Sequence, residues 1–186
     1  ISLNLAVDLF TFHGVIRSPL GVYESPEQSD ATYTQLDRAY IDLYFPGFDI
    51  TIGKQRVAMG LSYLWAPLDL FNRVNIFDPA EEKPGVNAIK AYIPIGKTSS
   101  LTGVFSPEDN FDSSKSGLRA QTQFAGIDAA LTLIHWGLQN QTIYGIDLRG
   151  ENFIGWWAEG GYFSSPAEKN MKLVVGFDYT FPFKTG

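Results

Sequence analysis

The chain has 186 residues, of which 45% are apolar and only 18% charged, and its formal net charge is −6. Soluble domains usually carry about 25% charged residues, and nucleic-acid binding needs a basic surface, so the composition argues against a nucleic-acid partner. Because cysteine is absent, disulfides, thiol nucleophiles and thiolate metal sites are excluded.

No apolar run approaches the roughly 18 to 20 residues that a membrane-spanning helix needs. A transmembrane strand needs only about 9 to 11 residues of alternating character, so a strand-built membrane protein stays open. The length suits one domain with a sizeable core, and we treat residues 1–186 as a single domain.

Alternation of apolar and polar residues runs through the whole chain and predicts an all-β protein. The first residues, ISLNLAVDLF, already alternate without a preceding signal peptide, so we expect a processed or incomplete chain. A helical turn is conceivable within 58–77, but Pro67 interrupts it. We expect ten strands, near residues 1–13, 33–45, 48–57, 86–94, 99–106, 116–124, 127–136, 141–149, 153–163 and 170–181.

The stretch RAYIDLYFPGFDITIGKQ, residues 38–55, predicts a hairpin around Pro46-Gly47 and shows both faces of the sheet. One face is apolar and the other is polar, so the apolar face is either a soluble core or a lipid-facing surface. Continued alternation would turn Lys54 and Arg56 toward the apolar face. We therefore expect either a bulge near Gly53 or a strand that has left the hydrocarbon layer there.

The connections between the expected strands alternate strictly between two classes, short turns and longer, more polar loops. In an up-and-down meander, alternate connections lie at the same end of the sheet, and outer-membrane barrels place short turns at one end and long loops at the other. The short class comprises Pro46-Gly47, 95–98, Ala125-Gly126 and 149–152. The long class comprises 14–32, 58–85, 107–115, 137–140 and 164–169.

A weak internal repeat supports this arrangement. The segments YFPGF, YIPIGKT and TFPFKTG each place aromatic or aliphatic residues before a proline, and each falls at the short-turn end. Proline cannot donate to a strand ladder, so it belongs at a strand end, where interfacial aromatic residues also lie. No strand follows the third copy, so we expect that the native chain continues beyond Gly186.

The face opposite the apolar one is polar or small in nearly every expected strand, which predicts a water-filled lumen. A soluble sandwich or a lipocalin-like barrel with the pattern turned inside out is the alternative, but long strands and a polar face poor in Lys and Glu favour the membrane barrel. The mixed charges fit ion pairs across the lumen or a modest cation preference. The predicted lumen residues are Arg38, Tyr40, Asp42, Asp49, Lys90, Arg119, Gln121, Asp128, Asp147, Arg149, Glu159, Lys172 and Asp178.

The connection 58–85 is longer than the roughly 12 to 15 residues of a plain loop, and loops of that length are usually functional or disordered. It is too apolar for disorder, so it must pack against the barrel mouth or lumen. We expect its charged residues to set a constriction, and the alternative is that they pair on the outer rim. The predicted constriction residues are Arg56, Asp69, Arg73, Asp78, Glu81, Glu82 and Lys83.

The segments IGKQR, WAPLDLFN, DPAEEKPGVNAIKAY and SSLTGVFSP resemble a broad group of bacterial porin-like outer-membrane proteins over roughly residues 36–107. The chain departs from that group by Ala66, where asparagine is common, and by its final residues, which lack a closing aromatic strand. The resemblance implies an outer-membrane location and passive diffusion of small hydrophilic solutes or ions. Porins often assemble as trimers, so it also leaves a homo-oligomer open.

We therefore expect an antiparallel, up-and-down transmembrane β-barrel that is part of a larger barrel, and a porin that needs no cofactor or metal. A structural or anchoring barrel without conductance is the main alternative, because eight strands leave a filled interior whereas sixteen to eighteen leave a channel. An outer-membrane enzyme is less favoured. The two histidines, His13 and His135, fall near the long-loop end but lie in no recognisable catalytic motif.

Overall fold

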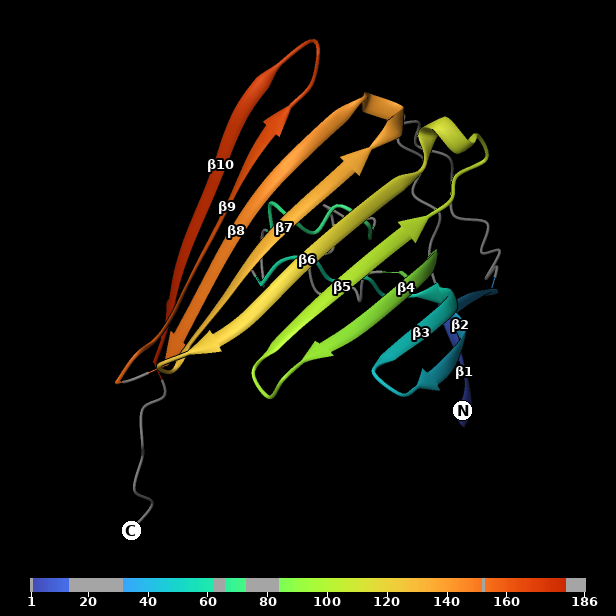
Figure 1. Ribbon diagram of the computed structural model, residues 1–186. Helices are drawn as coiled ribbons and strands as arrows, with labels where there is room; N and C mark the ends of the chain where they lie inside the picture. The colour runs from blue at the N-terminus through green and yellow to red at the C-terminus, as the bar shows by residue number, and fades with distance from the viewer. Residues whose placement is uncertain (1, 14–31, 62–65, 73–83, 152, 180–186) are drawn as a thin grey trace.

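The computed structural model describes residues 2–13, 32–61, 66–72, 84–151 and 153–179, and these form one antiparallel sheet of ten strands (Figure 1). Two short 3-10 helices, η1 (Phe111–Ser113) and η2 (Gly137–Gln139), lie in the connections. The predicted all-β class and ten strands are confirmed. The strands are β1 (Ser2–His13), β2 (Thr32–Phe45), β3 (Phe48–Gln55), β4 (Val86–Ile95), β5 (Ser99–Ser106), β6 (Lys115–Phe124), β7 (Ile127–Trp136), β8 (Gln141–Glu151), β9 (Gly155–Ser164) and β10 (Lys169–Asp178).

The strand order is the chain order, so each strand pairs with its sequence neighbours in an up-and-down meander. The short connections after β2, β4, β6 and β8 lie together at the lower end of the sheet in Figure 1, as the alternation of connection lengths predicts. Over the described residues the sheet is open, since β1 pairs with β2 and β10 with β9.

The strand register assigns the residues to two faces. Arg119 lies opposite Thr132, and we call the face that carries this pair the inner face. Leu118 lies opposite Leu133, and we call their face the outer face. The two leucines are 46% and 42% exposed, whereas Arg119 and Thr132 are buried. At these positions the sheet therefore buries polar side chains of its inner face and exposes apolar side chains of its outer face.

The pairing of β2, β3 and β4 continues through Gly53 without a shift of register, so the predicted bulge there is wrong. Instead, Gly53 adopts a φ of +131°, and a Cβ atom at this position would collide with the carbonyl oxygen of Ala39. Glycine has no Cβ and takes this conformation without inserting a residue. The register shift in this part of the sheet falls between Asp8 and Leu9, where β1 pairs with β2.

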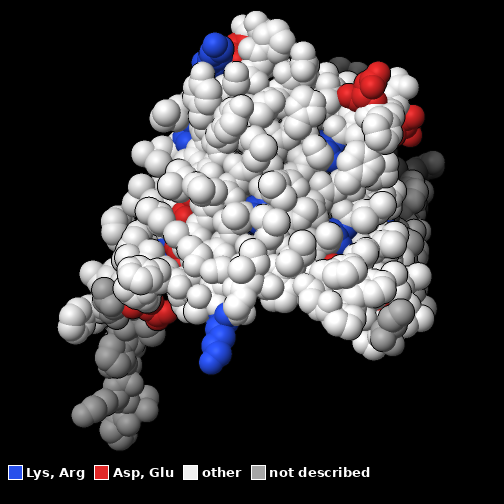
Figure 2. All heavy atoms as spheres, in the orientation of Figure 1, with Lys and Arg blue, Asp and Glu red and all other residues white. Residues whose placement is uncertain are grey.

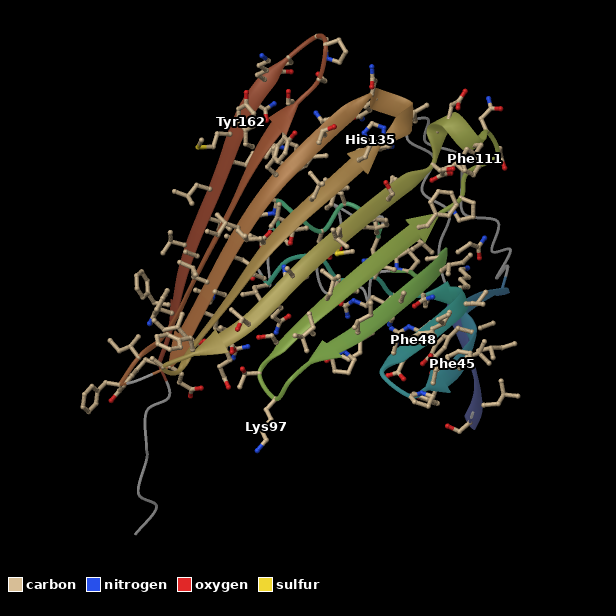
Figure 3. All side chains as sticks on the ribbon, viewed as in Figure 1. Phe45, Phe48, Lys97, Phe111, His135 and Tyr162 are labelled. Carbon is tan, nitrogen blue, oxygen red and sulfur yellow. The ribbon has the colours of Figure 1, made fainter. Side chains whose placement is uncertain are left out.

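Aromatic rings gather at the short-turn end of the sheet. Phe45 and Phe48 flank the Pro46-Gly47 turn and stack with their ring centroids 4.8 Å apart (Figure 3). Phe124 precedes the Ala125-Gly126 turn between β6 and β7 and is 80% exposed. Lys97, in the turn between β4 and β5, extends away from the sheet (Figure 3). In the described part of the chain, no helix has the length and apolar character needed to cross a membrane.

Candidate functional site

The inner face of the sheet carries the predicted lumen residues. Side-chain alternation along the paired strands places all thirteen of them on this face, although their surroundings differ. Arg119, Asp147 and Glu159 are buried, whereas Asp42, Asp49 and Lys90 are half-buried. Their lining of a pore stays a prediction.

The described parts of the connection between β3 and β4 lie across the inner face, behind the sheet in Figure 1. Apolar side chains of this connection meet apolar side chains of the strands and form the buried core of the molecule. The core also reaches Ala88 of β4 and Val104 of β5, but we call only the inner face of β6–β9 beneath this connection the covered half. The residues of the core are Val57, Met59, Leu68 and Phe71 from the connection, with Ala88, Val104, Ile134, Ile143 and Phe163 from the strands.

Glycines on the inner face make room for the connection. A Cβ atom on Gly145 would lie 2.5 Å from Cδ2 of Leu68, and one on Gly161 would lie 3.1 Å from the same atom. A Cβ atom on Gly117 would lie 2.9 Å from Cε of Met59. The distances at Gly145 and Gly117 are too short for real carbon contacts, and the one at Gly161 is unusually tight, so these glycines are notches into which apolar side chains of the connection fit.

A buried ion pair holds the part of the connection that follows β3. The Arg119 guanidinium donates to both carboxylate oxygens of Asp147, at 2.5 and 2.8 Å. The same guanidinium donates to the carbonyl oxygen of Met59 at 2.9 Å and to Oγ1 of Thr132 at 3.0 Å. A bidentate pair of this kind is geometrically specific, so the guanidinium can present one nitrogen to the connection in a fixed direction.

Glu159 holds two points of the connection with one carboxylate. Its Oε2 accepts from the backbone N–H of Leu61 at 2.7 Å, and its Oε1 accepts from the backbone N–H of Leu68 at 2.8 Å. Gly60 lies so close that a Cβ atom there would be 2.6 Å from Oε1. Because Glu159 is fully buried, these charge-assisted bonds replace water that the carboxylate would otherwise need.

Asn72 closes the connection upon itself. Its side-chain amide donates to the carbonyl oxygen of Val57 at 2.5 Å and accepts from the Val57 backbone N–H at 3.2 Å. It also donates to Oδ1 of Asp69 at 2.9 Å. These bonds join Val57, just after β3, to Asn72, fifteen positions later. The two described parts of the connection are therefore held side by side on the sheet.

The predicted constriction residues divide into described and undescribed positions. Asp69 is buried and accepts from Asn72, so it stabilises the connection itself. Arg56 is exposed and lines a hollow on the inner face. Arg73, Asp78, Glu81, Glu82 and Lys83 lie outside the described residues. The described parts of the connection pack on the inner face, while their action as a constriction stays a prediction.

The hollow at Arg56 measures about 430 Å³ and lies beside the covered half. We call the inner face of β2–β5 around it the open half. Its walls combine charged, aromatic and hydroxyl side chains with the apolar side chains of Val57, Ala58 and Val104. The lining residues are Asp42, Tyr44, Asp49, Thr51, Arg56, Val57, Ala58, Lys90, Tyr92, Thr102 and Val104.

The remaining predicted lumen residues are spread along the inner face. Gln121 and Asp128 border a smaller hollow of about 270 Å³ at the short-turn end. Lys172 places its ammonium 4.5 Å from the ring centroid of Phe163, at the margin of the covered half. Arg149 and Asp178 are exposed. No single cluster therefore gathers all the predicted residues.

His135 lies near the long-loop end of β7, as predicted, with Nδ1 3.3 Å from Oγ1 of Thr142. It is exposed on the outer face. The side chain of His13 lies outside the described residues. Within the part of the chain that the structure describes, no group of three His, Asp or Glu side chains could hold a metal ion.

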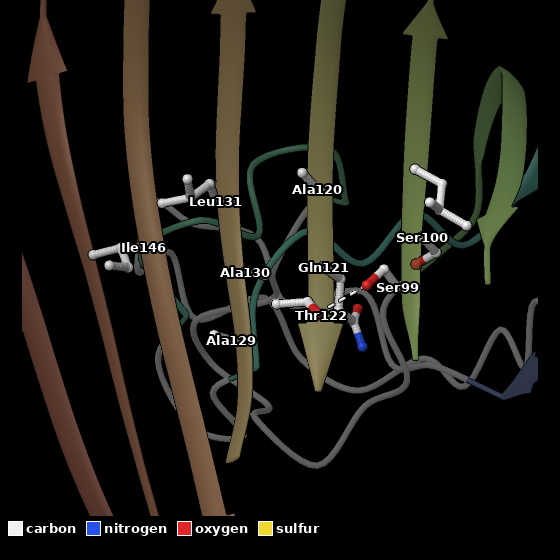
Figure 4. Close-up of a pocket in the computed structure, with 10 residues that line it drawn as sticks. Ser99, Ser100, Ala120, Gln121, Thr122, Ala129, Ala130, Leu131 and Ile146 are labelled. Atoms are coloured by element: carbon white, nitrogen blue, oxygen red, sulfur yellow. Dashed lines mark hydrogen bonds between the residues drawn. The ribbon is translucent and has the colours of Figure 1, made fainter. Parts of the chain in front are cut away.

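The outer face has a shallow depression where four small residues meet, Ser99, Ala120, Thr122 and Ala129 (Figure 4). Oγ of Ser99 and Oγ1 of Thr122 are hydrogen-bonded to each other at 2.8 Å. One of the two hydroxyls therefore donates to the other in a depression whose lining is mostly apolar.

Comparison with known proteins gives no relative: no protein-family model, no curated protein and no solved structure matches the chain. The geometry of the two halves of the inner face therefore carries the functional argument.

Proposed function

We propose that the sheet is part of a transmembrane β-barrel in a bacterial outer membrane, and that the protein is a porin through which small hydrophilic solutes or ions diffuse. The observation that carries this proposal is the outer face. Large apolar side chains are exposed on it from strand to strand, including Leu131 at 63%, Leu173 at 67% and Phe177 at 75%. Few charged side chains appear on this face (Figure 2). Contiguous apolar surface of this kind marks an interaction with protein or membrane.

Two details of the outer face fit lipid as the contacting medium. Hydrocarbon cannot satisfy a hydroxyl group, and the Ser99 and Thr122 hydroxyls already bond to each other. The exposed rings of Phe48 and Phe124 lie at the short-turn end, where transmembrane barrels carry an interfacial girdle of aromatic residues.

The inner face supports the diffusion role. The open half presents charged and hydroxyl groups around a hollow, and the connection packed on the covered half narrows the space on this side of the sheet. A path lined by both signs of charge beside a fixed loop suits solutes that are small and hydrophilic.

The covered half favours one other candidate, a structural barrel that anchors or spaces the envelope without conducting. There the connection covers the inner face with a buried apolar core that includes Leu68 and Phe71. A barrel filled in this way throughout would leave no water path.

Conductance separates the two candidates. The protein would be folded in detergent and reconstituted in planar lipid bilayers at low concentration. We expect discrete single-channel steps from the porin. A protein that inserts, as judged by flotation with vesicles and protection from protease, yet stays electrically silent would favour the anchoring barrel.

Membrane contact itself can be tested with Leu131→Lys on the outer face. In a bilayer, a lysine at the centre of the lipid-facing surface costs about 2–4 kcal/mol, whereas a change at an exposed position in water usually costs within about 0.5 kcal/mol. We expect the larger loss of unfolding free energy in lipid vesicles, measured by urea titration. A loss no greater than that of Leu131→Ala would contradict lipid exposure of this face.

A further inference from the structure

We propose that the hollow of the open half binds a small zwitterionic solute, one that carries an ammonium and a carboxylate group, such as an amino acid or a short peptide. This inference goes beyond the proposed function, because binding at the hollow does not depend on whether the protein conducts. It rests on the charges that line the hollow and on how they are partnered.

Three of the four charged side chains in the hollow make no bond within the described part of the chain. Among the described residues, Asp49, Arg56 and Lys90 have no hydrogen bond or ion pair through their side chains, and Asp42 accepts a single bond, from Thr51 at 2.7 Å. Both signs therefore line one hollow without reaching each other. Opposite charges that stay apart across a hollow leave room between them for a ligand that carries both.

One charge of each sign flanks the central strand of the hollow: Asp42 of β2 and Lys90 of β4 lie on either side of Thr51 of β3. The register places Asp42 on β2 and Asp49 on β3, which are adjacent strands. Lys90 lies on β4, opposite Thr51, and Arg56 follows the end of β3. A simple cation would be attracted by the carboxylates and repelled by Arg56 and Lys90, and a simple anion would meet the reverse. A zwitterion can place its ammonium at the carboxylates and its carboxylate at the cations.

In the covered half, by contrast, the charged side chains that stabilise the fold have bonding partners. Arg119 and Asp147 meet in a bidentate pair, and Glu159 accepts two backbone N–H groups. Within the described residues, Asp49, Arg56 and Lys90 lack such partners, although Arg56 directly precedes the anchored part of the same connection. They are therefore available to a solute.

The size and walls of the hollow suit such a solute. A volume of about 430 Å³ lies within the range of small-molecule sites, roughly 300–1,000 Å³. Tyr44 and Tyr92 line it, and aromatic rings attract ammonium groups through their faces. Thr51 and Thr102 add hydroxyl groups, which can donate to a carboxylate.

Three related probes test the charge requirement on the full chain folded in detergent. Alanine carries both charges, alaninamide only the ammonium, and N-acetylalanine only the carboxylate, and all three stay in water rather than entering micelles. Saturation-transfer NMR detects weak binding of each. We expect alanine to bind about tenfold more tightly than either relative, because each lost charge removes one charge-assisted contact.

Two variants make the test specific to the hollow. Asp49→Asn should reduce the preference for alanine over N-acetylalanine, and Lys90→Gln should reduce its preference over alaninamide, each about tenfold. Arg149→Gln removes a charge from the same face outside the hollow and should leave both preferences unchanged. Circular dichroism confirms that each variant is folded.

Equal binding of the three probes by the folded protein would overturn the proposal, as would no binding at all. Preferences that Arg149→Gln alters as much as Lys90→Gln does would also overturn it. Conductance, measured separately, reports on the porin. A conducting protein without the predicted preferences would refute the binding site alone, and a silent protein that shows them would refute the porin alone.

Discussion

The two halves of the inner face use charge in opposite ways. In the covered half, Arg119, Asp147 and Glu159 are buried, and every one of them is bound to the connection or to another of the three. In the open half, Asp49 and Lys90 line a hollow, and their side chains make no hydrogen bond or ion pair with any described residue. The comparison teaches that a charge on a predicted lumen face cannot be assigned to function until its partners are known.

The largest effect should come from Asp147→Ala in the covered half. The change leaves the Arg119 guanidinium buried without its carboxylate, and breaking a buried pair in this way costs about 3–5 kcal/mol. We expect that loss in the unfolding free energy from urea titration. The double variant Asp147→Ala with Arg119→Met should recover part of it, and a double variant as unstable as the single one would contradict this explanation.

Glu159→Gln should have the next largest effect, and it should be local. The amide keeps one oxygen acceptor but loses the charge, so one of the two backbone N–H groups loses a charge-assisted bond worth about 1.5–3 kcal/mol. We expect faster hydrogen exchange at the amides of Leu61 and Leu68, while the strand amides of β9 stay protected. Unchanged exchange at both would show that the carboxylate does not hold the connection.

Filling a notch should have a smaller effect. Gly145→Ala introduces a methyl group where Leu68 lies, and overpacking of this kind costs about 1–3 kcal/mol. Gly103→Ala is the matched control, because a Cβ atom there meets nothing within 4 Å. Thermal unfolding should therefore separate the two variants. Equal midpoints would contradict the packing of Leu68 against the sheet.

The smallest effect should come from Lys90→Gln in the open half. This side chain is half-buried and has no partner among the described residues, so its loss should change stability by no more than about 0.5 kcal/mol. Urea titration beside Asp147→Ala gives the comparison directly. A loss that approaches the effect of Asp147→Ala would erase the distinction between the two halves.

The sequence predicted the sheet well because strand alternation and connection length are local properties. The Pro46-Gly47 hairpin and the strict succession of short and long connections needed no knowledge of distant contacts. The two faces also followed from alternation, because neighbouring residues of a strand such as Leu118 and Arg119 point to opposite faces of the sheet.

The docking of the connection was only partly predictable. Its apolar character indicated that it packs somewhere, but the bonds from Leu61 and Leu68 to Glu159 join residues 98 and 91 positions apart. One signal was present in the sequence: Ile134, Ile143 and Phe163 fall at inner-face positions where a hydrated lumen would place polar residues. Together they marked the surface that the connection covers.

Those long separations also order the events of folding. Every strand of the meander pairs with its sequence neighbours, so hairpins can form one after another from local contacts. The anchor at Glu159 cannot form until β9 has been synthesised and joined to the sheet, and its contacts close the longest intervals of chain described here. The connection therefore packs late in folding, onto a sheet whose strands have already paired.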